Sequence, residues 1–125
     1  ARLLIMEDNE LLRKMTEEML VNFGWDVVGV RDGDRVLECY EAAKKAGQDF
    51  DMVMLDLSVK GGRGGRETLE LLREREPTVR AIVSSGYSND PVMLEYDRYG
   101  FSGAIAKPYS FLALDTLLRS ILYQS

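Results

Sequence analysis

The stretch that decides the fold reads Asp51-Met-Val-Met-Leu-Asp-Leu-Ser-Val-Lys60. Within it, Met52–Leu55 is an apolar run of the length expected for one strand buried on both faces. The run ends at Asp56, and a glycine-rich segment follows at residues 61–65. Desolvating a carboxylate at the end of a buried strand is costly unless partners compensate its charge, which favours a chemical role for Asp56. The stretch alone is equally compatible with Asp56 capping the loop that follows.

Apolar runs of strand length recur on both sides of this stretch, and helical patterns separate them. Four further strands are expected, at residues 3–6, 25–30, 79–83 and 104–106. The helices between and after the strands have N-terminal caps at Asn9 or Asp8, Asp90 and Ser110, and stops at Gly24, Gly47, Pro77 and Gly100. Strand and helix therefore alternate five times. This alternation predicts an α/β fold with one doubly wound parallel sheet and helices on both faces.

Composition limits the classes of protein to which the chain can belong. Its 125 residues suit one domain, residues 1–125, and its hydrophobic (46%) and charged (30%) fractions are ordinary for a globular protein. The net charge of -5 argues against a nucleic-acid-binding surface, and the lack of histidine excludes Ser-His catalysis and histidine metal sites. One cysteine, Cys39, excludes an internal disulfide. No apolar run is long enough for a membrane helix. Since Ala1 lies directly before the first strand, we expect a segment of a longer protein.

Polar residues stand where the predicted strands end. The first strand is followed by Glu7 and Asp8, and the third ends in Asp56. Ser85 and Lys107 follow the fourth and fifth strands. The carboxyl ends of parallel strands meet at one edge of a sheet, where ligands of such folds bind. Three acids, a hydroxyl and an ammonium together suit a hard, oxygen-liganded cation beside a phosphoryl group.

Each of these residues also has an ordinary structural interpretation. Glu7 and Asp8 can interact favourably with the dipole of the first helix, an effect of up to about 1 kcal/mol. Lys107 can be a surface residue, and Ser85 can belong to a turn. All of these interpretations would have to hold together for the site not to exist.

The chain resembles a receiver domain of two-component response regulators over essentially its whole length. The resemblance rests on Glu7-Asp8, Asp56, Ser85 with the small Gly86, and Lys107-Pro108, each at the expected strand end. The segments Leu-Asp-Leu-Ser-Val-Lys-Gly-Gly and Ser-Ser-Gly-Tyr-Ser-Asn-Asp-Pro are most similar to receivers of hybrid sensor histidine kinases. The resemblance implies a flavodoxin-like sheet with strand order 2-1-3-4-5 and a cytoplasmic location, for a parent protein that is either free or tethered to a membrane.

The resemblance also implies a mechanism. Asp56 is the expected phosphoacceptor, receiving a phosphoryl group from the phosphohistidine of a histidine kinase or histidine phosphotransfer protein. Asp8, Asp56 and the backbone carbonyl of Ser58 are expected to bind Mg²⁺ directly, and Glu7 through water. Lys107, assisted by a cis Lys107–Pro108 bond, and Ser85 would contact the phosphoryl group. No direct contact of this domain with nucleic acid or membrane is expected.

Two positions depart from the family pattern. Lys60 stands where many receivers have proline, and Ala104 stands where they usually have the tyrosine or phenylalanine of the activation switch.

A phosphatase with an aspartyl nucleophile would need a second acid at the position of Ser58. Arg63 among glycines is thin evidence for nucleic-acid binding, and the Gly-Lys-Ser/Thr ending of a nucleotide-binding loop is absent. The main alternative is a pseudo-receiver, a phosphorylation-independent adaptor, which would lack an acid or the lysine.

Overall fold

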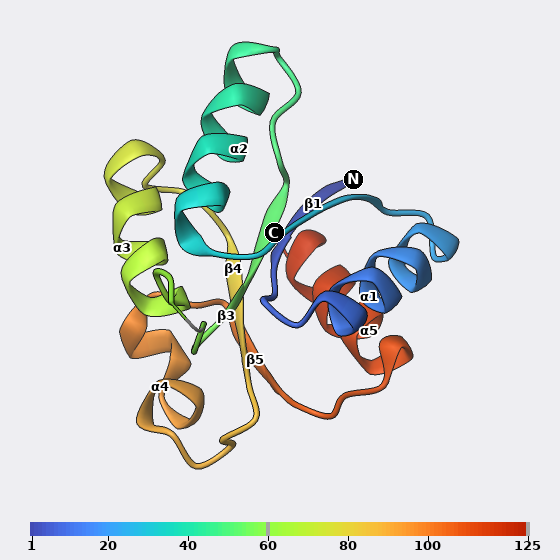
Figure 1. Ribbon diagram of the computed structural model, residues 1–125, viewed down its shortest axis with the longest axis vertical. Helices are drawn as coiled ribbons and strands as arrows, with labels where there is room; N and C mark the ends of the chain where they lie inside the picture. Colours follow the sequence, from blue (N-terminus) through green and yellow to red (C-terminus); the bar gives the residue numbers. More distant parts are fainter. Residues whose placement is uncertain (60, 125) are drawn as a thin grey trace.

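The computed structural model describes residues 1–59 and 61–124, which form a five-stranded sheet flanked by helices (Figure 1). The strands are β1 (Arg2–Met6), β2 (Asp26–Val30), β3 (Met52–Asp56), β4 (Ala81–Ser85) and β5 (Gly103–Ala106). The helices are α1 (Glu10–Asn22), α2 (Gly33–Lys45), α3 (Gly65–Arg75), α4 (Pro91–Leu94) and α5 (Phe111–Leu122), with a 3₁₀ helix, η1 (Tyr96–Tyr99), after α4. All pairings are parallel and the strand order is β2-β1-β3-β4-β5, which confirms the predicted doubly wound, flavodoxin-like sheet.

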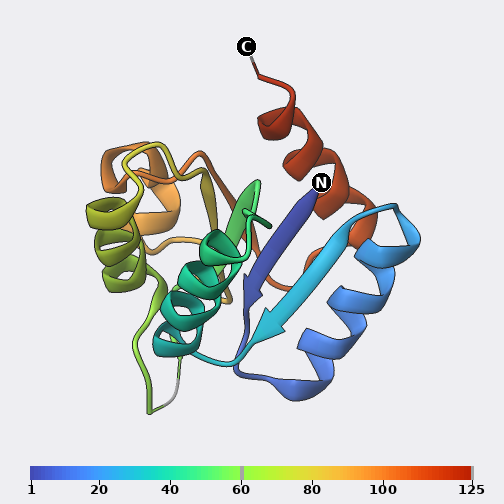
Figure 2. The ribbon, with the colours of Figure 1, turned by 90° about the horizontal axis from the view of Figure 1, so that it is seen from above.

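The sheet separates two hydrophobic cores. Helices α1 and α5 cover one face, and α2, α3 and α4 cover the other (Figure 2). Side chains of β1 alternate between the cores: Leu3 and Ile5 pack toward α1 and α5, and Leu4 and Met6 pack toward the opposite helices. All five residues of β3 are buried, as expected for a central strand. The order of winding reverses between β1 and β3, and a crevice at their carboxyl ends follows from that reversal.

Three of the predicted helix starts are confirmed by their capping hydrogen bonds. Of the two candidates for α1, Asn9 is the cap, and its Oδ1 accepts a hydrogen bond from the backbone N–H of Leu12 at 3.0 Å. Asp90 caps α4, with Pro91 as the first helical residue, and Ser110 caps α5. The apolar residues Leu12, Met15, Met19 and Phe23 recur at helical spacing, but the buried residues of α1 are Thr16 and Leu20.

The second and fourth strands differ from the predicted ranges. β2 begins at Asp26 rather than at residue 25. β4 begins two residues later than predicted and continues through Ser84 and Ser85. The pairing of Ser85 with Ala106, and the bond from the N–H of Lys107 to the carbonyl oxygen of Ser85 at 2.8 Å, extend the ladder past the apolar run. Backbone pairing therefore sets the end of β4, where hydropathy alone placed a loop.

The fourth helix is shorter than its start and stop signals predict. The α-helical turns end at Leu94 because Glu95 has a non-helical backbone (φ -121°, ψ 43°), and a 3₁₀ turn follows. Gly100 ends this segment with φ of +89°, in agreement with the predicted stop. Contacts with α3 hold the 3₁₀ segment: the Arg66 guanidinium lies 4.7 Å from the ring centroid of Tyr99, and Arg73 donates to the carbonyl oxygen of Gly100.

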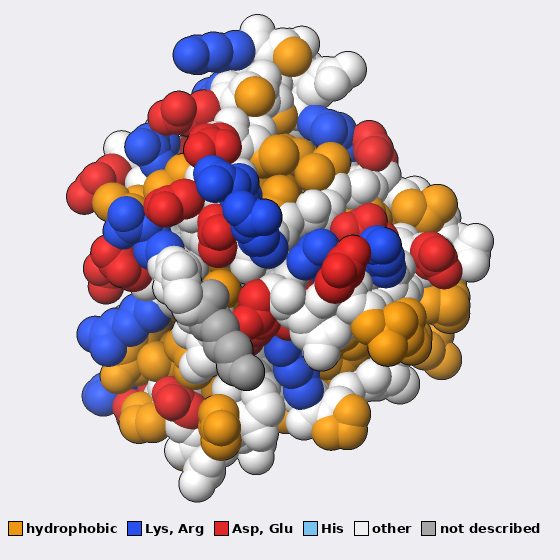
Figure 3. Space-filling model, in the orientation of Figure 1, with side chains coloured by type: hydrophobic (Ala, Val, Ile, Leu, Met, Phe, Trp, Pro, Cys, Tyr) orange, Lys and Arg blue, Asp and Glu red, His pale blue; other side chains and the backbone are white. Residues whose placement is uncertain are grey.

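The outer surface carries charges of both signs. On the face in Figure 3, acidic and basic side chains are interspersed, and hydrophobic side chains gather on the side where α1 and α5 lie. Two large apolar side chains of α1, Leu11 and Met15, are exposed. Among the described helices, none has the length and apolar character needed to cross a bilayer.

Candidate functional site: a pocket at the carboxyl ends of the strands

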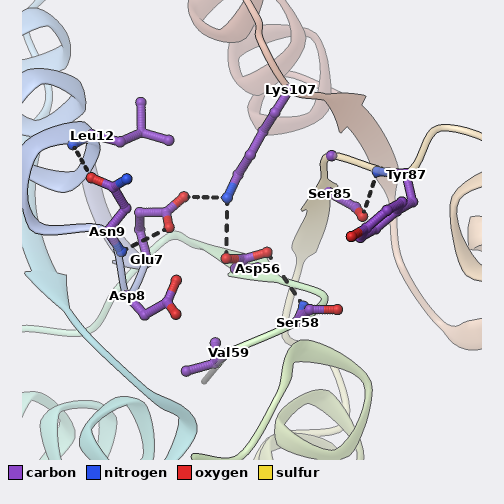
Figure 4. A pocket seen from close by; sticks show the side chains of 11 residues that line it. Glu7, Asp8, Asn9, Leu12, Asp56, Ser58, Val59, Ser85, Tyr87 and Lys107 are labelled. Carbon is purple, nitrogen blue, oxygen red and sulfur yellow. Dashed lines mark hydrogen bonds and ion pairs between the residues drawn. The ribbon is translucent and has the colours of Figure 1, made fainter. Parts of the chain in front are cut away.

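The carboxyl ends of β1, β3, β4 and β5 surround one open pocket (Figure 4). It contains every predicted site residue, although these residues lie a hundred positions apart in the chain. The residues that line the pocket are Glu7, Asp8, Asn9, Leu12, Asp56, Ser58, Val59, Ser85, Gly86, Tyr87 and Lys107. The parallel sheet alone brings these segments to one edge, as the sequence predicts.

Asp56 ends β3 and is only 3% exposed. Its Oδ2 accepts a hydrogen bond from Lys107 Nζ at 3.1 Å, and its Oδ1 accepts one from the backbone N–H of Ser58 at 3.3 Å. The bond to Ser58 is the loop cap that the sequence left open as an alternative. Capping and a pocket position therefore coexist, since each uses a different oxygen of the same carboxylate.

The glycines before α3 let that helix begin directly against the end of β3. A Cβ atom at Gly65 would lie 2.7 Å from the carbonyl oxygen of Asp56, and a Cβ at Gly64 would lie 2.6 Å from that of Leu57. Both distances are shorter than a carbon and a backbone oxygen tolerate. Gly64 and Gly65 thus allow the start of α3 to pack closely against the backbone of Asp56 and Leu57.

Glu7 is held at four of its atoms. Its N–H donates to the carbonyl oxygen of Val30 at 3.0 Å, and its own carbonyl oxygen accepts from Arg13 Nη1 at 2.9 Å. In its carboxylate, Oε2 accepts from the N–H of Asn9 at 3.1 Å, and Oε1 lies 2.5 Å from Lys107 Nζ. Glu7 is 5% exposed, so these contacts supply the compensation that a buried charge requires.

Burial and neighbouring charges both shift the pKa values of Asp56 and Lys107 in the pocket. Burial raises the pKa of Asp56 to about 6; the nearby Lys107 ammonium opposes this rise, and the Glu7 carboxylate adds to it. Burial by itself would lower the pKa of Lys107, but its hydrogen bond to Glu7 and the charge of Asp56 outweigh burial and raise that pKa. Lys107 is therefore a cation shared by two buried carboxylates.

Ser85 lies across the pocket from the acids (Figure 4). Its Oγ accepts a hydrogen bond from the backbone N–H of Tyr87 at 3.0 Å, so the hydroxyl hydrogen remains available for donation to a ligand. The turn interpretation of Ser85 and its place in the pocket are thus compatible, as they are for Asp56.

The segment after β5 begins with a cis Lys107–Pro108 bond, as expected. Ala104 lies on β5 opposite Val83 of β4, and its side chain is half-buried against the core of α2, α3 and α4. The departure at Lys60 lies outside the described residues.

The three acids satisfy the spacing expected of a site for one small cation. Each of Glu7, Asp8 and Asp56 offers an oxygen, and these oxygens lie within 4.8 Å of one another. Two ligands on opposite sides of a Mg²⁺ ion stand about 4.2 Å apart, since each bond is about 2.1 Å long. Carboxylates are also the donors that Mg²⁺ prefers. The donor set and its spacing therefore fit Mg²⁺ with small adjustments.

Sequence reasoning missed several residues around the pocket. Arg13 reaches back from α1 to the carbonyl oxygen of Glu7, although its position in the helix resembles that of any surface arginine. Thr16 Oγ1 lies 3.3 Å from the hydroxyl oxygen of Tyr109, a contact that ties α1 to the segment just after Lys107. Both interactions join distant parts of the chain, and neither has a local sequence pattern.

This fold with this set of strand-end residues defines a receiver domain, and comparison with known families agrees. A family described as the response regulator receiver domain matches residues 3–119. The chain belongs to the response regulator receiver domain family of two-component systems.

Curated relatives include both sensor kinases and response regulators. The chain is 33% identical over 89 residues to the CAI-1 autoinducer sensor kinase/phosphatase CqsS of Vibrio cholerae, covering 71% of this chain and 12% of that protein. It is 28% identical over 122 residues to the sensor kinase CckA of Brucella abortus (98% and 12%) and 27% identical over 125 residues to the response regulator FleR of Pseudomonas aeruginosa (99% and 25%). The chain thus spans a quarter or less of each of these three relatives.

Solved structures show the same fold. The BeF3-activated N-terminal receiver domain of RstA from Klebsiella pneumoniae matches with a TM-score of 0.85 at 23% identity, covering 99% of this chain and 100% of that one. The non-phosphorylated receiver domain of HemR from Leptospira biflexa matches with a TM-score of 0.85 at 21% identity (99% and 95%). At such identities the likeness establishes the architecture alone.

Proposed function

We propose that this receiver domain accepts a phosphoryl group on Asp56 from a phosphohistidine, in a Mg²⁺-dependent reaction, and signals by a conformational change at the pocket. One observation carries the proposal. A carboxylate that is only 3% exposed ends a central strand, faces an ammonium at 3.1 Å, and has oxygens of two further acids within 4.8 Å. Such an arrangement has a large desolvation cost, and the single loop-capping bond from Ser58 at 3.3 Å is a small return for it.

The chemistry needs an ionised, positioned carboxylate. One oxygen of Asp56 attacks phosphorus; a P–O bond forms, the P–N bond to the donor imidazole breaks, and its electron pair leaves on the imidazole nitrogen. With a pKa of about 6, most Asp56 side chains are ionised at neutral pH. The bonds from Ser58 and Lys107 fix the carboxylate plane, which restricts the direction of attack. Lys107 and the Ser85 hydroxyl would contact phosphoryl oxygens on Asp56.

The acidic cluster would hold the metal ion. Asp8, Asp56 and the backbone carbonyl of Ser58 would bind Mg²⁺ directly, with Glu7 behind a water molecule. When bound, the ion supplies positive charge that offsets the charge of the phosphoryl oxygens.

The proposal extends to partners. A histidine kinase or histidine phosphotransfer protein would supply the phosphoryl group, and a cytoplasmic location follows because such kinases draw on ATP. Residues 1–125 would act as one receiver domain, with the output in other parts of a larger protein. The pseudo-receiver alternative is not favoured, because Glu7, Asp8, Asp56 and Lys107 are all present and lie in one pocket.

The test is incubation with acetyl phosphate, with and without Mg²⁺, followed by intact-mass measurement. We expect one added phosphoryl group in the wild type, dependence on Mg²⁺, and no addition in Asp56→Asn. Asp51→Asn, which changes an exposed acid just before the start of the same strand, is the matched control and should be labelled normally. Equal labelling of Asp56→Asn and wild type would overturn the proposal.

A further inference from the structure

Arg13 is a charged residue of α1 that the proposed chemistry does not use. Its Nη1 donates a hydrogen bond of 2.9 Å to the carbonyl oxygen of Glu7, six residues earlier and outside the helix. Helix formation does not require this bond, because the N–H of Arg13 makes the regular helical bond to Asn9. The side chain instead turns back toward the loop that carries two of the three acids.

The carbonyl that Arg13 binds belongs to the peptide bond between Glu7 and Asp8. A peptide unit is planar and includes the Cα atoms of both residues. Holding its oxygen therefore fixes the orientation of the peptide plane and the position of the Asp8 Cα atom. β-sheet pairing does not do this, because the ladder between β1 and β2 ends at Met6 and Val30, and only the N–H of Glu7 continues it. Arg13 is therefore the described side chain that holds the carbonyl side of this loop.

The neighbouring strand leaves room for two side chains of α1, Glu17 and Arg13. A Cβ atom at Gly29 of β2 would lie 3.0 Å from Arg13 Cγ and 1.8 Å from Glu17 Oε1. The side chains of Arg13 and Glu17 thus lie over the bare backbone of Gly29, and any larger residue there would displace them. Gly29 has no positive φ that would otherwise call for glycine. Its lack of a side chain is explained by this close approach.

We propose that Arg13 is a positioning residue for the metal site, acting on Asp8 through the carbonyl of Glu7. The inference deepens the proposed function and rests on it, since the ion in question is the Mg²⁺ of the phosphotransfer reaction. Partners that orient metal ligands typically change metal affinity by about 10- to 100-fold when they are removed.

The direction of the change in Mg²⁺ affinity distinguishes a positioning role of Arg13 from an effect of its charge. A guanidinium close to a cation site repels the cation, so removal of its charge alone would strengthen Mg²⁺ binding. Loss of positioning would weaken binding. The matched control is Lys14→Met, which removes the same charge from the next residue of the same helix and breaks only an exposed pair with Glu10.

The experiment is calorimetric titration of Mg²⁺ into wild type, Arg13→Met, Arg13→Lys and Lys14→Met, each with its stability measured in urea. We expect Arg13→Met to weaken binding by about tenfold or more, Arg13→Lys to recover part of the loss, and Lys14→Met to bind as wild type or slightly tighter. Binding by Arg13→Met that equals or exceeds that of Lys14→Met overturns the inference. If Arg13→Met does not fold, Arg13→Gln, which removes the guanidinium and keeps a polar side chain, takes its place under the same criterion.

A second measurement works without the metal. Backbone ¹⁵N relaxation of residues 7 to 9 in the metal-free protein should show greater mobility in Arg13→Met than in wild type. Lys14→Met should show no such increase. Unchanged relaxation in Arg13→Met contradicts the positioning role. If wild type binds no Mg²⁺, the proposed function fails, and this measurement still decides whether Arg13 holds the loop.

Discussion

At the scale of single residues, the pocket is a set of charges that compensate one another only in part. Lys107 lies between Glu7 and Asp56, so one ammonium serves two buried carboxylates. The pKa of Asp56 still rises to about 6, chiefly because burial disfavours its ionised form. The metal-free site therefore carries a cost in stability that a bound cation would relieve.

This cost has a definite dependence on pH. Asp56 has a pKa of about 6 in the folded protein and an ordinary value of 3.8, so the folded state holds the extra proton between these values. The free energy of unfolding of the metal-free protein should accordingly fall as pH rises from 4 to 6 and level off above. Asp56→Asn should lack this contribution and be more stable at pH 7 by about 1 to 3 kcal/mol.

Urea unfolding across this pH range measures the effect. Excess Mg²⁺ should reverse the order, because it stabilises the wild type by binding the folded state and has less affinity for the variant. A metal-free Asp56→Asn variant that is less stable than wild type at pH 7 would contradict this account of the pocket.

Substitution of Lys107 should destabilise the metal-free protein, whereas substitution of Asp56 should stabilise it. Lys107→Met removes the cation that compensates Glu7 and Asp56, leaving two buried carboxylates near one another. We expect the metal-free variant to be destabilised at pH 7 by about 3 kcal/mol, the typical cost of an uncompensated buried charge, and to recover part of this loss below pH 5. Arg31→Met, which removes an exposed cation paired with Asp32, is the control. Equal stability of both variants at pH 7 would argue that the lysine compensates nothing.

At the scale of the elements, close backbone approach fixes the loop after β3. Because a Cβ at Gly65 would lie 2.7 Å from the carbonyl oxygen of Asp56, Gly65→Ala must move either α3 or the end of β3. We expect a loss of about 1 to 3 kcal/mol in stability together with weaker Mg²⁺ binding. Gly86→Ala serves as a control for stability, since nothing lies within 4 Å of its Cβ position. Similar stabilities for the two variants would refute the close-packing role.

The elements also constrain how a signal can leave the pocket. Ala104 has no ring to rotate, and Arg66 and Arg73 of α3 hold the segment after α4 in place. We therefore expect binding of beryllofluoride at Asp56 to cause small, graded shifts of the backbone NMR signals. These shifts should lie mainly in the loops after β3 and β4. Large slow-exchange changes across α4, η1 and β5 would instead indicate exchange between two packed states.

At the scale of the whole molecule, the parts that sequence patterns predict are those that depend on periodicity and strand ends. Alternation of apolar runs and helical spacing gives the sheet, and parallel pairing then brings Glu7, Asp56 and Lys107 to one edge. The continuation of β4 through Ser85 was not predicted, because its backbone pairing leaves no trace in hydropathy. The early end of α4 was also missed, because the non-helical backbone at Glu95 has no signal in the sequence between the start at Asp90 and the stop at Gly100.

The site itself was predictable only in its polar strand ends. Carboxylates after apolar runs stand out in a sequence, whereas a single arginine in a helix does not. Arg13 acquires its significance from the carbonyl of Glu7 and the bare backbone of Gly29, and only the folded chain brings these together.

The central claim, that Asp56 is the phosphoacceptor, is tested most directly by locating the acyl phosphate. Borohydride reduces an acyl phosphate to an alcohol, so a phosphorylated aspartate becomes homoserine, and trypsin releases residues 46–60 as one peptide. That peptide contains Asp49, Asp51 and Asp56, so the first two serve as internal controls. After treatment with acetyl phosphate, we predict homoserine at position 56 alone and only when Mg²⁺ is present. Homoserine at position 49 or 51, or an unmodified Asp56 in protein that has gained a phosphoryl group, would contradict the account.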